Sequence, residues 1–344
     1  MQLEKFNDRN VLVIGGAGYI GSVLVGKLMQ AGAKVRVLDH LIYDNGYSLQ
    51  HYFDEPNFSF INDDFCDGKV LNSALDGMTD VVLLASLVGD PICKRYPELA
   101  VKVNRDATQH LIDSMAEKGT ERFTFASTCS NYGIHEGDAL ATETSDLNPQ
   151  SIYAETKIAV ETYILENAAK LPYSPTILRF ATAYGFSPRM RFDLTVSHFA
   201  SELAVGGSLD VYDPDTWRPY CHVRDLSKAI MTVLAEDKAK VSGEVFNVGD
   251  TGQQFTKRMI VDEALKHLGE REVSYVSGDT DPRNYRVSFD KVAKQIDFTC
   301  DYSVERYVPS LINAVQNGVF TPSRSGNRYG NYEIPESIAK VAAG

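Results

Sequence analysis

The chain has 344 residues, a formal net charge of −12 and 44% hydrophobic residues. This length allows a large buried core in one domain or in two closely joined domains. The acidic excess argues against nonspecific binding to nucleic acid or to an anionic membrane surface, and no apolar run is long enough to span a bilayer.

The cysteine pattern predicts a reduced environment. The chain has 5 cysteines, and none of them forms a C-x-x-C pair or a metal-binding spacing. Charged residues, among them Glu4, Lys5 and Arg9, precede the first apolar run, so no signal peptide is visible. We therefore expect a cytoplasmic protein with free thiols and without a metal site.

The stretch VLVIGGAGYIG, residues 11–21, carries the strongest motif of the chain. Val11–Ile14 is typical of a buried parallel strand, and apolar residues at helical spacing follow over Ser22–Ala31. Between them, Gly15, Gly18 and Gly21 fit the pattern G-x-x-G-x-x-G. Glycine lets a phosphate approach the backbone, and the helix N-terminus offers free N–H groups. This stretch therefore predicts a dinucleotide-binding site.

An acidic residue indicates which dinucleotide is bound. The second predicted strand, Lys34–Leu38, ends at Asp39, about 20 residues after the glycine loop, where a carboxylate binds ribose hydroxyls. A carboxylate repels a 2′-phosphate, and residues 40–42 include no arginine. We therefore expect NAD rather than NADP.

Strands and helices alternate through the first half of the chain, which predicts an α/β fold with a Rossmann-type, doubly wound parallel sheet. The second half is less regular. We expect a cofactor-binding domain over residues 1–182 and about 222–249, a smaller C-terminal α/β substrate-binding domain over about 183–221 and 250–320, and an extended or flexible tail at 321–344. Pro309 should kink or split the last predicted helix. The further predicted strands are Phe58–Ile61, Val81–Ala85, Arg122–Ala126 and Thr176–Phe180, and the longest predicted helices are Leu99–Lys118 and Tyr153–Lys170.

Tyr153 and Lys157, in the sequence YAETK, indicate acid–base chemistry. Their i, i+4 spacing places both on one face of the predicted helix. A free tyrosine titrates near ~10, and a nearby ammonium group lowers its pKa. Reaching ~7 takes roughly 4 kcal/mol, which we expect Lys157 and a cationic nicotinamide ring to supply together. Thr128 ends a neighbouring strand and can share the hydrogen-bond network. A solvated helix face can show the same spacing by chance, but here it follows a complete dinucleotide motif.

These motifs resemble those of the extended short-chain dehydrogenases/reductases, in particular the nucleotide-sugar epimerase/dehydratase family. The similarity covers about residues 8–320. GGAGYIG resembles the cofactor loop, NDDFCD the G-D-x-x-D segment, LLASLVG the L-A-A segment and FASTCSNYG the S-S-x-x-x-Y-G segment. LRFATAYG and WRPYCHVRD resemble later segments of the family. The whole looks like UDP-galactose 4-epimerases, while LVGDPICKRYP and GFSPRMRFD look closest to GDP-heptose 4-dehydrogenases and epimerases.

The resemblance implies an NAD-dependent enzyme for a nucleotide-diphosphate sugar. It also implies a homodimer formed through the helices at Leu99–Lys118 and Tyr153–Lys170. Asp64 would bind the adenine amino group and Phe65 would flank the ring. The implied catalytic residues are Thr128, Tyr153 and Lys157, and the implied cofactor-binding residues are Gly15, Gly18, Tyr19, Ile20, Gly21, Asp39, Asp64, Phe65, Leu84, Ala85, Ser86, Asn104, Tyr153 and Lys157.

The sequence departs from the family pattern at two places. Family 4,6-dehydratases carry Asp-Glu directly after the catalytic threonine, whereas this chain has Cys129 and Ser130, which argues against a dehydratase. Cys129 is interpreted as a small core residue, with an acid–base role as the alternative. Thr182 stands where the family usually has asparagine, and we keep it as a candidate substrate contact.

Arginines in the later part of the chain are candidates for binding a diphosphate, because the guanidinium group suits this anion. Arg218 is the first candidate and Arg283 the second, although a surface role is open for any single arginine. Arg189 and Arg191 could equally bind a neighbouring loop or subunit, and Arg179, inside a strand, is interpreted as structural.

We expect an NAD-dependent epimerase that acts on a nucleotide-activated sugar through a transient 4-keto intermediate. The alternatives are a 4-dehydrogenase or 4-ketoreductase with net NAD(H) turnover and a non-catalytic redox sensor. Redox sensors on this fold usually lose the tyrosine or the lysine, whereas this chain keeps both Tyr153 and Lys157.

Overall fold

The computed structural model describes residues 6–135, 139–278, 281–321, 327–336 and 338. Within this part of the chain the main layer is a seven-stranded sheet in the order β10-β6-β5-β4-β1-β2-β3, and all its strand pairs are parallel. The predicted doubly wound Rossmann sheet is confirmed, and its order reverses beside β1, where such sheets bind ligands. The strands are β1 (Asn10–Ile14), β2 (Lys34–Leu38), β3 (Phe58–Ile61), β4 (Asp80–Leu83), β5 (Arg122–Thr128), β6 (Ser174–Phe180) and β10 (Glu244–Val248).

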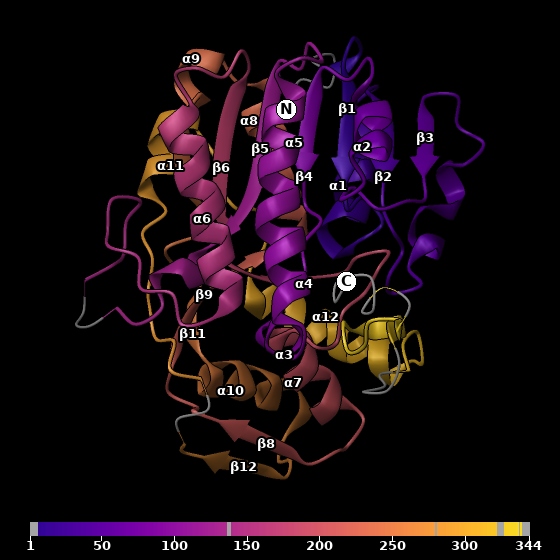
Figure 1. Ribbon diagram of the computed structural model, residues 1–344. Helices are drawn as coiled ribbons and strands as arrows, with labels where there is room; N and C mark the ends of the chain where they lie inside the picture. Colours follow the sequence, from indigo (N-terminus) through magenta and orange to yellow (C-terminus); the bar gives the residue numbers. More distant parts are fainter. Residues whose placement is uncertain (1–5, 136–138, 279–280, 322–326, 337, 339–344) are drawn as a thin grey trace.

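Helices cover both faces of the sheet, as its apolar strands require. On one face, Leu24 of α1 and Ile230 of α8 belong to one buried cluster with Val13 of β1. On the other face, Leu111 of α5 and Val160 of α6 pack in a second cluster, and Figure 1 shows α5 and α6 in front of the sheet, running along its strands. The covering helices are α1 (Tyr19–Gln30), α2 (Gly68–Leu75), α5 (Ala107–Met115), α6 (Ile152–Asn167) and α8 (Val223–Ala235).

The predicted helix Leu99–Lys118 is wrong as a single element. The chain forms α4 (Pro97–Val101), then the π-helical turn η3 (Lys102–Asp106) and then α5. Such π turns often lie at functional sites, and this one carries the buried side chain of Asn104. The short helix α3 (Asp90–Arg95), which precedes α4, was not predicted, because six residues are too few to show a helical period.

A smaller layer lies below the carboxyl ends of the sheet strands in Figure 1. Its core includes Val196 of α7, Ile260 of α10 and Leu311 of α12. The expected split at Pro309 is wrong, since α12 continues through this residue. The layer contains α7 (Thr195–Ala204), α10 (Lys257–Leu268), α12 (Val304–Gln316), β7 (Thr182–Tyr184), β8 (Leu209–Tyr212), β9 (Trp217–His222), β11 (Gln254–Thr256) and β12 (Val273–Val276); the remaining elements are η2 (Gly46–Tyr52), η4 (Cys129–Tyr132), α9 (Lys238–Val241), α11 (Asp290–Ile296) and η5 (Asn327–Tyr329).

A buried ion pair joins helix α6 to the sheet. Arg179 of β6 donates from Nη2 to Glu161 Oε2 at 2.6 Å, and the two side chains are only 5% and 2% exposed. Ser127 and Asn131 donate to Glu161 Oε1, and Arg179 Nη1 donates to Tyr132 Oη at 3.0 Å. A buried pair of this kind is stable only when its remaining hydrogen-bonding groups are satisfied, as they are here. The structural role predicted for Arg179 agrees with this network.

We predict that Arg179→Met destabilises the protein by about 3–5 kcal/mol, because Glu161 would remain buried without its cation. Chemical unfolding of Arg179→Met, Glu161→Leu and the double variant should give a coupling energy above about 1 kcal/mol. The exposed pair Lys238–Glu121, at 2.9 Å, is the matched control and should give a coupling below about 1 kcal/mol. Equal coupling in the two pairs would contradict the prediction.

Candidate active site

A cleft of about 820 Å³ opens at the carboxyl ends of the sheet strands and extends to the smaller layer. This volume suits a large organic ligand. With the single exception of Asn104, every candidate site residue predicted from the sequence lines the cleft. These residues are Gly15, Gly18, Tyr19, Ile20, Gly21, Asp39, Asp64, Phe65, Leu84, Ala85, Ser86, Thr128, Tyr153, Lys157, Thr182, Arg218 and Arg283.

The glycine loop packs closely against the residues that follow β4. Gly15 has a φ of 86°, and a Cβ added to it would lie 2.5 Å from the backbone nitrogen of Ala85. A Cβ on Gly21 would lie 2.2 Å from the carbonyl oxygen of Gly15, so neither position accepts a side chain. Helix α1 begins after Gly18, and no side chain caps its N-terminus. These backbone N–H groups fit a dinucleotide diphosphate.

Asp39 sits at the end of β2 with its carboxylate held in place. Its Oδ2 accepts from the Ala17 N–H and its Oδ1 from the Leu41 N–H, both at 2.9 Å. Burial raises the pKa of this carboxyl, while the two backbone hydrogen bonds oppose the rise. Asp64 and Phe65 line the same end of the cleft, where the resemblance places the adenine.

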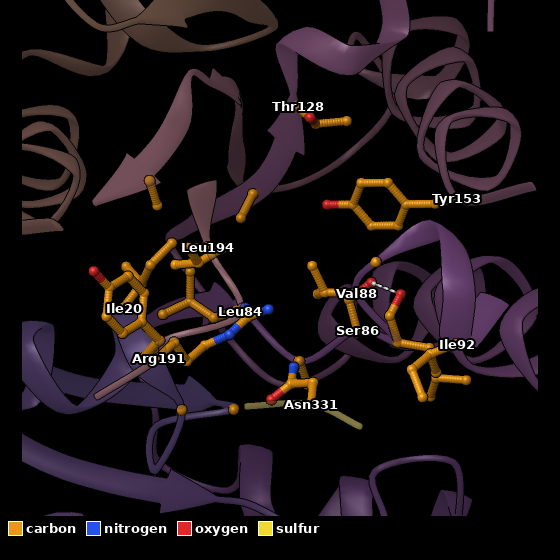
Figure 2. Close-up of a pocket in the computed structure, with 18 of the residues that line it drawn as sticks. Ile20, Leu84, Ser86, Val88, Ile92, Thr128, Tyr153, Arg191, Leu194 and Asn331 are labelled. Carbon is orange, nitrogen blue, oxygen red and sulfur yellow. Dashed lines mark hydrogen bonds between the residues drawn. The ribbon is translucent and has the colours of Figure 1, made fainter. Parts of the chain in front are cut away.

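Thr128 and Tyr153 face the cleft from β5 and α6. Figure 2 shows the Tyr153 hydroxyl directed into the cleft with Thr128 nearby. Thr128 Oγ1 accepts from the Ser130 N–H at 3.0 Å, which orients the hydroxyl at the strand end. Lys157, one turn after Tyr153, donates from Nζ to the Ala126 carbonyl at 2.8 Å and is 2% exposed. The structure therefore brings the three predicted catalytic residues into one site.

The expected lowering of the Tyr153 pKa by Lys157 is not seen. Burial raises the pKa of Tyr153, and nearby Cys93 and Asp90 raise it further, while Arg191 opposes them. Lys157 Nζ lies 5.8 Å from the centre of the Tyr153 ring and is bound to a carbonyl oxygen. Burial also lowers the pKa of Lys157 to about 8, which weakens its charge as pH rises. The protein alone therefore keeps Tyr153 protonated.

Asn104 is not among the residues that line the cleft, and its contact with the cofactor stays a prediction. Its Oδ1 accepts from Ser86 Oγ and from the Leu87 N–H, both at 2.8 Å, and its Nδ2 donates to the Leu87 carbonyl at 3.1 Å. Asn104 is 1% exposed. It supports the Ser86–Leu87 connection from behind, and that connection in turn lines the cleft.

The two arginines predicted to bind substrate are ion-paired with acids in the cleft. Arg283 donates to both carboxylate oxygens of Asp281, at 2.8 and 2.9 Å, and its Nη2 lies 2.8 Å from Asp90 Oδ2. Arg218 Nη2 lies 3.0 Å from Asp281 Oδ2. Burial by itself would raise the pKa of Asp281, but the two arginines lower it to about 2. A substrate anion would therefore share these cations with Asp281 and Asp90.

The sequence matches the model of the NAD dependent epimerase/dehydratase family over residues 11–249. The chain belongs to this family. It is 30% identical to the low-salt glycan biosynthesis protein Agl12 of Haloferax volcanii, over 76% of this chain and 84% of the relative. It is 25% identical to UDP-glucuronic acid decarboxylase 1 of Arabidopsis thaliana, over 90% of this chain and 70% of the relative.

A solved structure gives the same result. The UDP-glucose 4-epimerase of Thermotoga maritima, determined with UDP-glucose, superimposes with a TM-score of 0.81 and 25% identity. The match covers 90% of this chain and all of that structure. This family member is therefore an NAD-dependent enzyme in which the glycine loop, the acid after β2 and the Tyr–Lys pair all lie around one cleft. Among the described residues, no helix is long and apolar enough to cross a membrane. The same residues include no group of three or more histidine, cysteine, aspartate or glutamate side chains that could hold a metal ion.

The residues after Thr128 differ in where they point. Cys129 is 1% exposed, does not line the cleft and donates from Sγ to the Arg179 carbonyl at 3.2 Å, while burial raises the pKa of its thiol. Its interpretation as a core residue agrees with this position. Ser130 does line the cleft, and its hydroxyl lies 3.3 Å from the Tyr285 hydroxyl.

Sequence reasoning missed part of the cleft wall. Arg189 and Arg191, for which a loop or subunit contact was weighed, both line the cleft, and Arg189 is 1% exposed. Asn331 and Tyr332 of the C-terminal segment also line it, although nothing in the tail indicated a function. Arg189 and Arg191 could have been found as anion-binding residue types, whereas Asn331 and Tyr332 match no sequence pattern that predicts a site.

Cofactor choice is predicted to depend on Asp39. Replacing it by alanine and introducing arginine at His40 should weaken NAD binding and admit NADP, because the ribose acceptor is lost and a cation for the 2′-phosphate is gained. Calorimetric titration of both dinucleotides into wild type and variant measures the change. If wild-type protein already prefers NADP, the interpretation of Asp39 is wrong.

Lys157→Met is predicted to abolish turnover and yet to raise stability by up to about 3 kcal/mol at pH 7, because the folded pKa of about 8 lies below the ordinary value of about 10.4. The folded protein holds this proton less tightly than the unfolded chain, so wild-type stability rises with pH between these two values. The gain from methionine is therefore full below pH 8 and disappears above about pH 10.4.

Urea unfolding of wild type and variant at several pH values measures this gain. The matched control is Lys170→Met, which removes an exposed lysine just after α6 and should change stability little at any pH. A gain for Lys157→Met that does not vary with pH would show that packing, not the buried charge, causes it.

Proposed function

We propose that this enzyme epimerises a nucleotide-activated sugar through a transient 4-keto intermediate. One observation carries the proposal: Thr128, Tyr153 and Lys157 meet at the cleft that holds the dinucleotide motif, and the position after Thr128 holds no acid. The likeness to an epimerase solved with UDP-glucose supports a nucleotide sugar as the substrate.

The side chains divide the chemistry of oxidation at C4. Bound NAD supplies the hydride acceptor and a positively charged ring. Tyr153 Oη takes the proton of the sugar hydroxyl, and Thr128 Oγ1 donates a hydrogen bond that orients this hydroxyl. Lys157, held by the Ala126 carbonyl, would bind the ribose of the dinucleotide. Because burial raises the pKa of Tyr153, its ionisation would depend on the positive charge of the bound ring and on Arg191, which opposes the rise.

The residues after Thr128 favour epimerisation over loss of water. Elimination of the C6 hydroxyl needs an acid and a base, and the buried thiol of Cys129 and the neutral hydroxyl of Ser130 supply neither. The 4-ketone would then either be reduced on its other face, which gives the epimer, or be released from the enzyme. Return of the hydride needs no second redox partner, which favours the epimerase over a 4-dehydrogenase or 4-ketoreductase.

The reaction is tested with a stoichiometric amount of enzyme and a panel of UDP-, dTDP- and GDP-sugars, followed by mass spectrometry and NADH absorbance. We predict an isomer of unchanged mass without lasting NADH. Loss of two hydrogens with NADH accumulation would show a dehydrogenase. Loss of water or of carbon dioxide at the turnover rate would show a dehydratase or a decarboxylase, and each of these results would overturn the proposal.

Tyr153→Phe should bind NAD normally and lose most turnover, by about 10²–10⁴-fold, because the proton acceptor is removed while the ring remains. Calorimetry reports NAD binding and the mass assay reports turnover. The control is Tyr163→Phe on the same helix, since this tyrosine binds Asp113 at the surface, away from the cleft. Near-native turnover of Tyr153→Phe would rule out its role as the base.

A further inference from the structure

Arg191, in the segment GFSPRMRFD, is a cation of the cleft to which the resemblance assigned no role. It lies in the connection between β7 and α7, and its side chain is 12% exposed. Figure 2 shows it on the same side of the cleft as Ile20 and Leu84, with Asn331 beside it. Its charge acts on Tyr153, where it opposes the rise in pKa that burial causes.

A neighbouring carboxylate holds the Arg191 guanidinium in a fixed plane. Nε donates to Asp193 Oδ1 at 2.9 Å and Nη2 donates to Asp193 Oδ2 at 2.6 Å. A two-point contact of this kind fixes orientation as well as charge. Within the described chain, no hydrogen-bond partner occupies Nη1, which remains for a ligand in the cleft.

The C-terminal segment holds Asp193 from the other side. We call residues 327–336 the C-terminal strap. The Asn331 N–H of the strap donates to Asp193 Oδ2 at 3.2 Å, and the Tyr329 carbonyl accepts from the Phe192 N–H at 2.7 Å. At its far end Ile334 is 5% exposed and packs with the cluster that includes Leu87 and Ile92, beside Tyr153. The strap thus runs from the smaller layer to the sheet side of the cleft.

We propose that Arg191 binds a diphosphate group in this cleft, and that Asp193 and the C-terminal strap set its orientation. Tyr19, which lies within electrostatic range of Arg191, is the first residue of the twelve-residue helix α1, whose uncapped N-terminus favours an anion. Arg218 and Arg283 are shared with Asp281 and Asp90, and Arg191 adds a third cationic donor to the cleft. In a chain of net charge −12, such a local cation matters for any anionic ligand.

Two ligands bring a diphosphate to this cleft: the dinucleotide and, if the proposed function holds, the nucleotide sugar. The test titrates NAD, UDP, dTDP and GDP separately into wild type, Arg191→Gln and Arg191→Lys by calorimetry. We expect Arg191→Gln to weaken NAD, or the nucleoside diphosphate that wild type binds, by about 10–100-fold, as for a lost hydrogen bond to a charged group. Arg191→Lys should restore part of the loss, because it keeps the charge but not the fork.

The ligand whose binding is weakened by Arg191→Gln identifies the source of the diphosphate. The matched control is Arg258→Gln, which removes an exposed arginine with the same two-point contact to Asp215, at 2.8 and 3.1 Å, outside the cleft. The proposal is overturned if Arg191→Gln binds every ligand as wild type does while its melting curve is unchanged. Calorimetry measures binding without turnover. The test of Arg191 therefore remains valid even if the epimerase assay fails.

The positioning role of the strap has its own readout. Asp193→Asn keeps the shape but loses the charge that holds Arg191, and Ile334→Asp places a charge in the buried anchor of the strap. Both should weaken the same ligand as Arg191→Gln, and neither should add a further loss in the Arg191→Gln background, because they act through this side chain. Full additivity with Arg191→Gln would refute the positioning role.

Discussion

The buried ion pair between Glu161 and Arg179 sets the geometry on which the catalytic group depends. Glu161 lies on α6, two turns after Tyr153, and its carboxylate accepts hydrogen bonds from both sides of Thr128, through Ser127 and Asn131. One carboxylate therefore joins the helix that carries Tyr153, the proposed base, to the strand end that carries Thr128. The pair is buried and fully bonded, so a shift of α6 that separated it would leave a charge unpaired. This cost opposes movement of α6 relative to β5.

The cleft of the protein alone disfavours the ionised forms of Tyr153 and Lys157. Tyr153 is kept protonated by burial and by Asp90, while Lys157 is buried at a cost that lowers its pKa to about 8. Proteins accept such unfavourable environments mainly at functional sites, where a ligand changes the balance. Under the proposed function, the cationic ring of NAD would favour the ionised tyrosine, and an anionic diphosphate would favour the charged lysine.

Membership of the family does not by itself define the reaction, because the relatives of this chain include epimerases, dehydratases and decarboxylases. We expect the difference to lie in a few groups around the reacting carbon. Here the Cys129 thiol is buried in the core, and the Ser130 hydroxyl lies near the Tyr285 hydroxyl. The two positions after Thr128 therefore do not supply an acid and a base. The cleft also contains Arg191 and the strap residues, to which the resemblance assigned no role. We expect substrate choice to depend on these groups.

The features that the sequence determined by itself are contiguous: the glycine loop, the acid after β2 and the Tyr153–Lys157 spacing each lie within one strand, turn or helix, so local patterns predict them. The tertiary structure decided which distant segments meet. Asn104 lies on a π-helical turn and is buried against the Ser86–Leu87 connection, a contact between segments 17 positions apart. The C-terminal strap reaches Asp193 across 138 positions of sequence, and no local pattern records that contact. The charge of a buried group depends on all its neighbours, so the direction of the Tyr153 pKa also came only from packing.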